Sequence, residues 1–332
     1  METKIFSKDQ LDDAVKLLKR GELVAFPTET VYGLGALATD EVAVKNVYAA
    51  KGRPSDNPLI VTVSNPEMMA RYVTQIPEVA EKLINQFWPG PLTIILKVKE
   101  GALPNAVTGG LTTAAFRNPQ DKLTQELISK LDAPIVGPSA NTSTKPSPTT
   151  AEHVFHDLNG KIAGIVDNGP TEIGLESTII DLSVETPVVL RPGEITPEQL
   201  SEALGQAVLM NKGTTQTKGV PKAPGMKYRH YAPSAPVYIV DDVKDFEKIV
   251  YNNQVGVAAL SNVLKNIEAN NTFNLGENID EAAHNLFGAL RYFDEQKNIK
   301  KIYVQGFQQG DISAAYMNRL TKAAAGHHYF NK

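Results

Sequence analysis

The chain has 332 residues, of which 42% are hydrophobic and 21% charged, and its formal net charge is −4. This composition is typical of a soluble globular protein, and the length suits two domains. The acidic balance, with an isoelectric point near 5.9, argues against a protein that mainly coats nucleic acid but allows a local basic pocket. The absence of cysteine excludes disulfides, zinc–thiolate sites and cysteine nucleophiles.

The N-terminal residues METKIFSKDQLDD are acidic and contain no apolar run, so they do not predict a secretory signal. No uninterrupted apolar stretch approaches the ~20 residues needed to span a bilayer. We therefore expect no membrane contact and a cytoplasmic location.

Local patterns in residues 1–205 predict a series of helices and strands. Ser7 and Gln10 form a capping box that begins a helix ended by Gly21, and Asp40 caps a second helix that runs to about residue 50. Further helices are predicted at 77–87, from 149 onward and at 196–205. Apolar runs predict strands at 23–26, 60–63, 93–98, 112–116, 134–136, 162–166, 178–182 and 188–190. Because several strands follow one another directly, a twisted mixed sheet is predicted rather than a strictly parallel one.

Residues 206–236 have the composition of a linker: 206–218 are polar and patternless, and VPKAPGMKYRHYAPSAP follows. Beyond it the pattern alternates regularly. Strands are predicted at 237–240, 255–260 and 301–305, and helices at 243–250, 279–294 and 314–325. This alternation predicts a small Rossmann-like α/β domain. The predicted organisation is a first domain at 1–205, a linker at 206–236 and a second domain at 237–332.

The segment KGRPSDNPL, residues 51–59, is the most informative in the chain. Pro54 and Pro58 fix the backbone and remove donors, so the segment is predicted as a stiff loop. Lys51 and Arg53 would project from that loop, which suits a polyanionic ligand. Solvated charges at the end of the preceding helix are the alternative.

Two arginines share one local pattern. Arg117 and Arg191 each end a predicted strand and precede a proline turn, in AAFRNP and VVLRPG. This placement makes a shared anion pocket a reasonable hypothesis, with exposed charges at the sheet edge as the alternative.

A loop rich in hydroxyl groups, GPSANTSTKPSPT, spans residues 137–149 after a predicted strand. Ser139, Asn141 and Ser147 are candidate hydrogen-bond partners for phosphate or ribose oxygens, and a flexible Ser/Thr loop is the alternative. Ser177 leads into a later strand and could face the same site.

Other motifs are weaker. Gly33, Gly35 and Ala38 match G-x-G-x-x-A, but Pro27 ends the preceding strand early, so turn glycines are favoured over a dinucleotide fingerprint. His153 and His156 lack a third ligand, which favours a surface pair over a metal site. There is no Walker loop and no G-x-S-x-G elbow.

Taken together, these motifs resemble the YrdC-like threonylcarbamoyl-AMP synthase family in its longer, two-domain form. The resemblance is carried by FPTETVYGLG, KGRPSDNPL, WPGPLT, the GPSAN…SPT loop, ESTIID and VVLRPG, between residues 26 and 193. PGMKYRHYAP, residues 224–233, is similar to the linker of the long form. The family often has Ser-Gly after the loop asparagine, whereas here Ser143 is followed by Thr144, and Gly137 stands where the family often has Ala.

The resemblance implies a nucleotidyltransferase that converts L-threonine, bicarbonate or CO2, and ATP into threonylcarbamoyl-AMP and pyrophosphate, for modification of adenosine in tRNA. It implies no covalent nucleophile and no protein metal site, with Mg²⁺ assisting at the phosphates. The ATP-binding residues that it implies are Lys51, Arg53, Thr113, Ser139, Asn141, Ser147, Arg191 and Tyr231. The threonine-binding residues that it implies are Thr28, Asn57, Arg117 and Ser177.

The resemblance also suggests that Tyr228, Arg229, His230 and Tyr231 form a lid hinged near Gly225, with a passive tether as the alternative. The second domain would act as a cover. Contact with tRNA or with downstream tRNA-modifying proteins stays open. Two rival functions remain: a non-catalytic RNA-binding module with a YrdC-like fold, and a different ATP-using enzyme.

Overall fold

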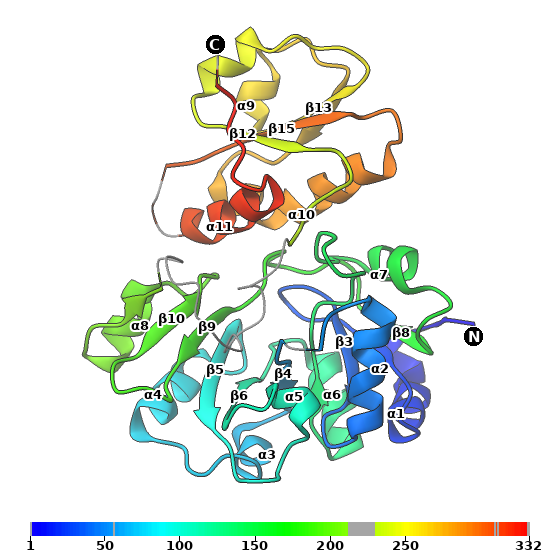
Figure 1. Cartoon of the computed structure of the whole chain (residues 1–332), viewed down its shortest axis with the longest axis vertical. Coiled ribbons are helices and arrows are strands. Elements are labelled where there is room, and N and C mark those ends of the chain that lie inside the picture. The colour runs from blue at the N-terminus through cyan, green and yellow to red at the C-terminus, as the bar shows by residue number, and fades with distance from the viewer. Residues whose placement is uncertain (1, 56, 212–229, 309, 311, 331–332) are drawn as a thin grey trace. The chain divides into compact units, whose positions relative to one another are not determined.

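The computed structural model describes residues 2–55, 57–211, 230–308, 310 and 312–330. These residues form two compact units (Figure 1), and the second unit is assembled from three stretches of sequence. The first unit comprises Met1–Ser143, Pro148–Glu172 and Glu176–Lys227, and the second comprises Thr144–Ser147, Ile173–Leu175 and Tyr228–Lys332. Two short segments from the middle of the chain therefore belong structurally with its C-terminal part.

The first unit is built on a mixed sheet that contains 11 strands in the described part of the chain. The strand order is β1-β8-β2-β3-β7-β4-β6-β5-β9-β10-β11. The strands are β1 (Lys4–Phe6), β2 (Val24–Phe26), β3 (Gly33–Leu37), β4 (Ile60–Thr62), β5 (Leu92–Lys97), β6 (Thr113–Arg117), β7 (Ile135–Val136), β8 (Gly164–Val166), β9 (Thr178–Asp181), β10 (Val188–Arg191) and β11 (Leu209–Met210). Parallel pairs such as β4 with β6 alternate with antiparallel pairs such as β5 with β6, which confirms the predicted mixed α/β sheet.

Helices pack on this sheet through apolar stripes. The helical elements of the unit are η1 (Lys8–Gln10), α1 (Leu11–Lys19), α2 (Glu41–Lys51), α3 (Pro66–Ala70), α4 (Glu78–Phe87), α5 (Asn105–Thr108), α6 (Lys122–Leu131), α7 (Ala151–Leu158) and α8 (Pro197–Leu204). In α1 the buried positions Leu11, Ala14, Val15 and Leu18 recur at helical spacing and join the main core. Asp40 caps α2 as predicted, because its carboxylate accepts from the backbone of Val42 and Ala43.

The prediction of turn glycines at Gly33 and Gly35 was wrong, because both lie inside strand β3. Their antiparallel partner β2 explains the residue type. A Cβ on Gly33 would lie 2.5 Å from the ring of Phe26, and one on Gly35 would lie 2.7 Å from the carbonyl oxygen of Val24. Glycine therefore allows β2 to approach closely, and no dinucleotide turn is formed there.

The predicted linker differs from the structure in one described part. β11 lies within the stretch 206–218, which was predicted to be without structure, and it pairs in parallel with β10. Residues 212–229, including Gly225, Tyr228 and Arg229, lie outside the described residues. Across the part of the chain that is described, we find no helix with both the length and the apolar character of a membrane span.

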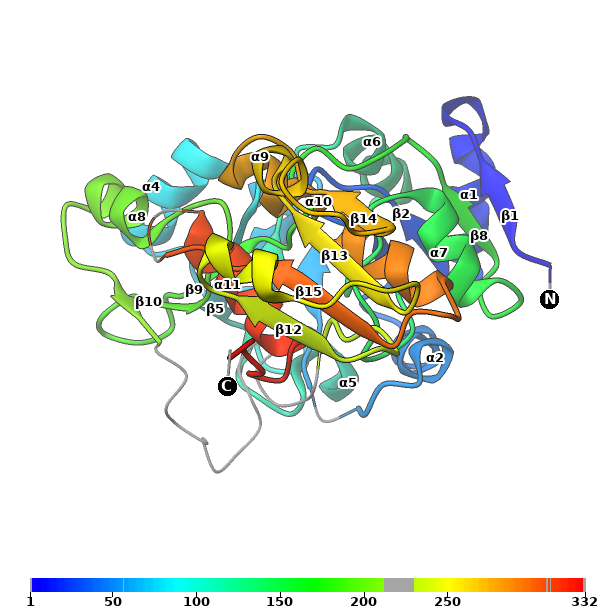
Figure 2. The same ribbon diagram turned by 90° about the horizontal axis from the view of Figure 1, so that it is seen from above.

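The second unit has a parallel sheet of four strands among the described residues, in the order β12-β15-β13-β14, seen side by side in Figure 2. Its elements are β12 (Val237–Val240), η2 (Val243–Lys248), β13 (Val255–Ala259), α9 (Ser261–Leu264), β14 (Asn271–Asn274), α10 (Ile279–Glu295), β15 (Lys301–Gln305) and α11 (Ser313–Ala323). This confirms the predicted small Rossmann-like domain. The helix predicted at 243–250 is the shorter 3₁₀ helix η2, and β14 was not predicted.

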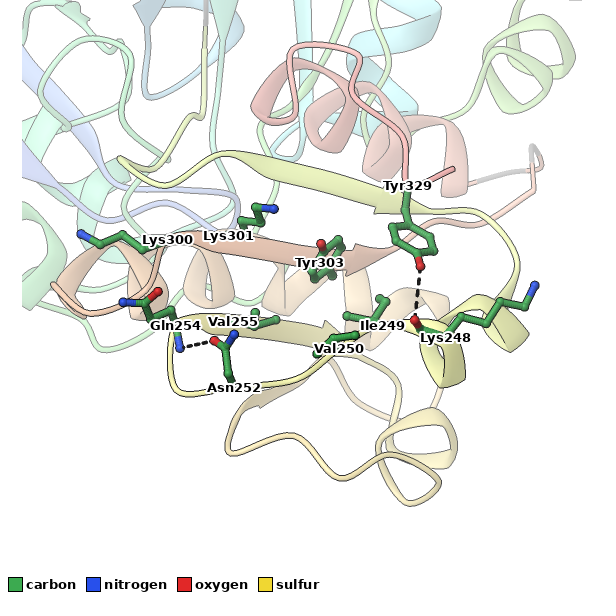
Figure 3. A pocket seen from close by; sticks show the side chains of 10 residues that line it. All are labelled: Lys248, Ile249, Val250, Asn252, Gln254, Val255, Lys300, Lys301, Tyr303 and Tyr329. Atoms are coloured by element: carbon green, nitrogen blue, oxygen red, sulfur yellow. Dashed lines mark hydrogen bonds between the residues drawn. The ribbon is translucent and has the colours of Figure 1, made fainter. Parts of the chain in front are cut away.

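The second unit has a core of its own. Val240, Phe246 and Val257 pack together on one side of the sheet. Helix α10 packs closely on β13, because Gly256 leaves room for the ring of Phe293: an added Cβ would lie 2.6 Å from it. A pocket of about 440 Å³ lies on the same side of the sheet as Val240, Phe246 and Val257 (Figure 3). It is lined by Lys248, Ile249, Val250, Asn252, Gln254, Val255, Lys300, Lys301, Tyr303 and Tyr329.

Candidate active site

One face of the large sheet carries a polar row beside a small apolar floor. Strand register places Arg117 opposite Thr62 on one side and Thr93 on the other, and paired positions share a face. An apolar cluster separate from the main core lies on the same face: three of its members are two residues along their strands from this row, and the fourth, Ile179, lies opposite Thr93. Its buried members are Ile60, Ile95, Ala115 and Ile179. The face therefore offers charged and hydroxyl groups next to apolar surface, as a site for a polar organic ligand would.

Arg117 is held by groups that the sequence analysis did not select. Its Nη2 lies 2.7 Å from Oε1 of Glu29, and the two side chains are 8% and 3% exposed. Neither of these two atoms has a hydrogen-bond partner among the described residues, so the contact is an ion pair without hydrogen-bond geometry. Among the described residues neither carboxylate oxygen of Glu29 receives a hydrogen bond. A buried carboxylate with unused acceptors suggests that a further donor belongs beside it.

A chain of hydroxyl groups continues from Arg117. Its Nη1 donates to Oγ1 of Thr30 at 2.7 Å. Because an arginine can only donate, the Thr30 hydroxyl is left to donate to Oγ1 of Thr28, 2.9 Å away. Thr28 in turn donates to the carbonyl of Val31 and accepts from its backbone N–H. The predicted threonine-binding residues Thr28 and Arg117 therefore lie in one buried network.

Arg191 and Ser177 form a second network. Nε of Arg191 donates to the Ser177 carbonyl at 3.0 Å, and Nη2 donates to Oγ of Ser177 at 3.1 Å. The Ser177 hydroxyl also shares a hydrogen bond with Oγ1 of Thr93, 2.7 Å away. Since Thr93 is opposite Arg117 in the sheet, the two predicted arginines lie on neighbouring parts of the same sheet. They are buried, with 7% and 6% exposure, which rules out the alternative of exposed edge charges.

Lys51 differs in position from the prediction. It is the last residue of α2 rather than part of the loop, and only 2% of it is exposed. Gly52, at φ 62°, then ends the helix. The Lys51 ammonium donates to the Asn141 carbonyl at 2.7 Å and to that of Ser139. Lys51 therefore holds the loop that carries two other predicted ATP-binding residues.

The remaining predicted residues are more dispersed. Nη2 of Arg53 lies 3.5 Å from the carbonyl of Asn57, whose buried side-chain oxygen receives no hydrogen bond from the described residues. Thr113 is buried at the start of β6, opposite Lys97 of β5. Ser147 and Tyr231 belong to the second unit. The first unit thus contains three groups, around Arg117, Arg191 and Lys51, and the first two are linked through Thr93.

The histidine pair at 153 and 156 finds local partners. Nδ1 of His153 accepts from the Thr149 backbone at 3.2 Å, and Nδ1 of His156 lies 3.0 Å from Asp157. In the described part of the chain, no group of three histidine, aspartate or glutamate side chains is arranged to hold a metal ion. The groups present are fixed cations and hydroxyls, which suit positioning and charge stabilisation rather than covalent catalysis.

Sequence reasoning missed Glu29, Thr30 and Thr93, although each lies within a motif that it quoted. Glu29 and Thr30 stand in FPTETVYGLG, and Thr93 stands in WPGPLT. The single glutamate next to Thr28 is a weak signal of a site residue, because a glutamate in a loop is normally solvated. Only its burial against Arg117 distinguishes Glu29 from an ordinary solvated glutamate.

Two family models together cover most of the chain. A model described as telomere recombination, for the Sua5, YciO and YrdC proteins, matches residues 16–193. A second, described as the threonylcarbamoyl-AMP synthase C-terminal domain, matches residues 195–325.

Individual proteins match over nearly the full length. The threonylcarbamoyl-AMP synthase of Pyrococcus abyssi is 44% identical over 321 residues, with 94% of this chain and 93% of that protein covered. The enzyme of the same name from Bacillus subtilis is 45% identical over 325 residues, with 96% and 93% covered. The crystal structure of P. abyssi Sua5 complexed with L-threonine superposes with a TM-score of 0.90 at 41% identity, covering 98% of this chain and 99% of that one.

These matches extend over both units and include every motif that forms the polar networks described above. The chain therefore belongs to the YrdC-like threonylcarbamoyl-AMP synthase family, in its two-domain form.

Proposed function

We propose that this chain makes threonylcarbamoyl-AMP and pyrophosphate from L-threonine, bicarbonate or CO2, and ATP, to supply the threonylcarbamoyl modification of tRNA adenosine. The observation that carries the proposal is identity of 44–45% with enzymes of that name over more than nine-tenths of both chains. The P. abyssi structure with bound L-threonine supports threonine as one substrate. The reaction class that follows is nucleotidyl transfer.

The chemistry fits the groups in the site. The lone pair of the neutral threonine amine forms a bond to the carbon of CO2, and loss of one proton from nitrogen to solvent leaves a carbamate. A carbamate oxygen then attacks the α-phosphorus of ATP, and the bond from that phosphorus to the pyrophosphate oxygen breaks. Such a displacement depends on positioning and charge neutralisation, which fixed arginines, lysines and hydroxyls provide.

We assign the residues in two sets. Arg117, with Thr28, Asn57 and Ser177, would hold threonine; a planar guanidinium suits its carboxylate. The apolar floor beside Arg117 offers contact for its methyl group, which is the only difference from serine. Phosphate charge would be met by Lys51, Arg53 and Arg191, and the rest of the nucleotide by Thr113, Ser139, Asn141, Ser147 and Tyr231.

Mg²⁺ is proposed to bind together with ATP rather than at a site made of protein side chains. The described residues contain no cluster of three acidic or histidine side chains that would hold such an ion. Phosphate oxygens of the nucleotide would therefore be its main ligands.

The decisive experiment is the release of pyrophosphate, measured with and without threonine and with and without bicarbonate. Release should require both. Release that ignores threonine would favour another ATP-using enzyme. Tight tRNA binding without threonine-dependent turnover would favour the RNA-binding module. A net charge of −4 is, however, unusual for a protein that binds the phosphate backbone of nucleic acid.

A contact with tRNA, or with proteins that use the product, is a further proposal. The pocket in Figure 3 carries Lys300 and Lys301, both exposed, close to Tyr303. Cations beside an aromatic ring suit single-stranded nucleic acid. Filter binding of tRNA to the Lys300→Ala, Lys301→Ala double variant tests it: unchanged affinity would contradict a contact there. A cytoplasmic location stays a prediction.

A further inference from the structure

Helix α10 of the second unit carries a buried arginine that holds a loop from a distant part of the sequence. Arg291 is 4% exposed. Its Nη2 donates to the carbonyl of Pro146 at 2.6 Å, and its Nε donates to the carbonyl of Ser147 at 3.3 Å. Both carbonyls belong to Thr144–Ser147, the segment that is part of the second unit although its neighbours on either side, residues 143 and 148, belong to the first.

A second attachment lies one turn further along the same helix. The Lys145 ammonium lies 2.7 Å and 3.0 Å from the two carboxylate oxygens of Asp294. Asp294 also accepts from the backbone N–H of Ser234 at 2.6 Å. Since residues three apart share a face of a helix, Arg291 and Asp294 hold the segment from the same side.

The backbone of this region is in a conformation that must be held. Thr144 has φ 77° and Tyr231 has φ 63°, in the left-handed region that non-glycine residues rarely adopt. The N–H of Ala232, the residue after Tyr231, donates to the carbonyl of Thr144 at 2.9 Å, so a hydrogen bond ties the chain next to one strained residue to the other. The ring of Tyr231 lies 5.1 Å from that of Phe287 on α10. Strained residues persist where the surroundings fix them, and such places are often functional.

We propose that Arg291 is a positioning residue for ATP. It does not touch the nucleotide: it fixes the carbonyls of Pro146 and Ser147, and thereby the place of the buried Ser147 side chain. A guanidinium suits this task because its planar fork can donate to two neighbouring carbonyls at once. This inference rests on the proposed function, in which Ser147 and Tyr231 bind the nucleotide, and it gives helix α10 a part in that binding.

The test compares Arg291→Ala, Arg291→Lys and Lys145→Ala with Glu295→Gln, a change at an exposed neighbouring position of the same helix. In the pyrophosphate-release assay Arg291→Ala should raise the KM for ATP by about 10- to 100-fold, the effect of misplacing a binding group. The KM for threonine should stay unchanged. Arg291→Lys, which keeps one donor direction, should fall between, and Glu295→Gln should behave as the wild type.

Hydrogen exchange supplies a readout that does not depend on activity. Backbone amides in residues 139–149 should exchange faster in Arg291→Ala than in the wild type, with those of β5 and β6 unchanged. If the KM values for ATP and threonine rise together, or if exchange in 139–149 is unaltered, the role of Arg291 is only structural and the inference is wrong. Should Arg291→Ala not fold, Lys145→Ala, which removes the ion pair between the loop and Asp294, gives the same comparison.

The two hypotheses fail differently. A wild-type protein that releases no pyrophosphate in response to threonine and bicarbonate refutes the proposed function. An active wild type whose Arg291→Ala and Lys145→Ala variants keep the normal KM for ATP refutes this inference alone.

Discussion

Buried charges define the candidate site at the level of single residues. Arg117 and Arg191 were predicted from a local pattern of strand, arginine and proline, and both are buried on the sheet. The partner of Arg117 was not predictable in the same way, because Glu29 lies far from it in the sequence and meets it only in the folded chain. The partner of Arg191 is Ser177, which the sequence did suggest as a site residue. A buried ion pair is costly to break, and this leads to the first prediction.

Glu29→Gln should lower the free energy of unfolding by about 3–5 kcal/mol, because it leaves the buried guanidinium of Arg117 without a counter-charge. The threonine-induced rise in Tm should then be larger than in the wild type, since the substrate carboxylate becomes the counter-charge of Arg117 in place of Glu29. Thermal melts with and without threonine measure both effects. Glu41→Gln, which removes an exposed pair with Lys45, is the control and should cost less than about 1 kcal/mol. A smaller threonine effect in Glu29→Gln would place the substrate ammonium on Glu29 and contradict this prediction.

Lys51→Ala and Arg191→Ala should each reduce turnover at least about 100-fold, as loss of a charge-stabilising group does in other enzymes. Lys51→Ala should have two effects, because it removes a positive charge and also the donor that holds the carbonyls of Ser139 and Asn141. Steady-state pyrophosphate release gives the rates. Near-normal turnover in both variants would mean that the site is elsewhere.

At the level of elements, the loop 137–149 contains a residue with a strained backbone. Thr144 has the left-handed backbone conformation that glycine adopts without strain. Strand β3 shows a different use of glycine: Gly33 and Gly35, whose spacing suggested a turn, allow close packing against β2. Helix α6 was not predicted, although Asp121 caps it and Leu123, Leu127 and Leu131 form a regular apolar stripe.

Thr144→Gly should therefore stabilise the protein by about 1 kcal/mol, the strain relieved less the entropy that glycine loses on folding. Ser143→Gly, at a neighbouring residue that has no positive φ, is the matched control and should destabilise. Urea unfolding of both variants provides the two free energies. Equal destabilisation would show that Thr144 is not strained.

The attachment between Lys145 and Asp294 should make stability depend on pH. Burial works to raise the pKa of Asp294, but hydrogen bonds from Lys145 and Ser234 outweigh it and hold the pKa below the ordinary 3.8. A carboxylate with a lowered pKa in the folded state contributes stability that is present above the unfolded pKa and lost as pH falls through the folded one. The difference in unfolding free energy between the wild type and Asp294→Asn should thus be constant above about pH 5 and shrink below about pH 4. Urea melts across this range would show it; a difference independent of pH would contradict the assignment.

At the level of the whole molecule, each unit has a core of its own. The main core belongs to the large sheet, and the cluster around Phe246 and Val257 belongs to the small one. Separate cores usually unfold in separate steps, so calorimetry should give a van't Hoff enthalpy below the calorimetric one. Phe246→Ala should cost about 3–5 kcal/mol and shift one of the two transitions. A single transition that shifts as a whole would show that the units unfold together.

The sequence by itself determined most of the strands and helices, the two α/β patterns and the motifs that hold the substrate-binding candidates. It could do so because turns, caps and apolar periodicity are local properties of the chain. Only the tertiary structure decided that Glu29 faces Arg117, that Lys51 is buried against Ser139 and Asn141, and that Thr144–Ser147 belongs to the second unit. These contacts join residues about 90 to 150 positions apart, and they follow from strand register and close packing, which no local pattern encodes.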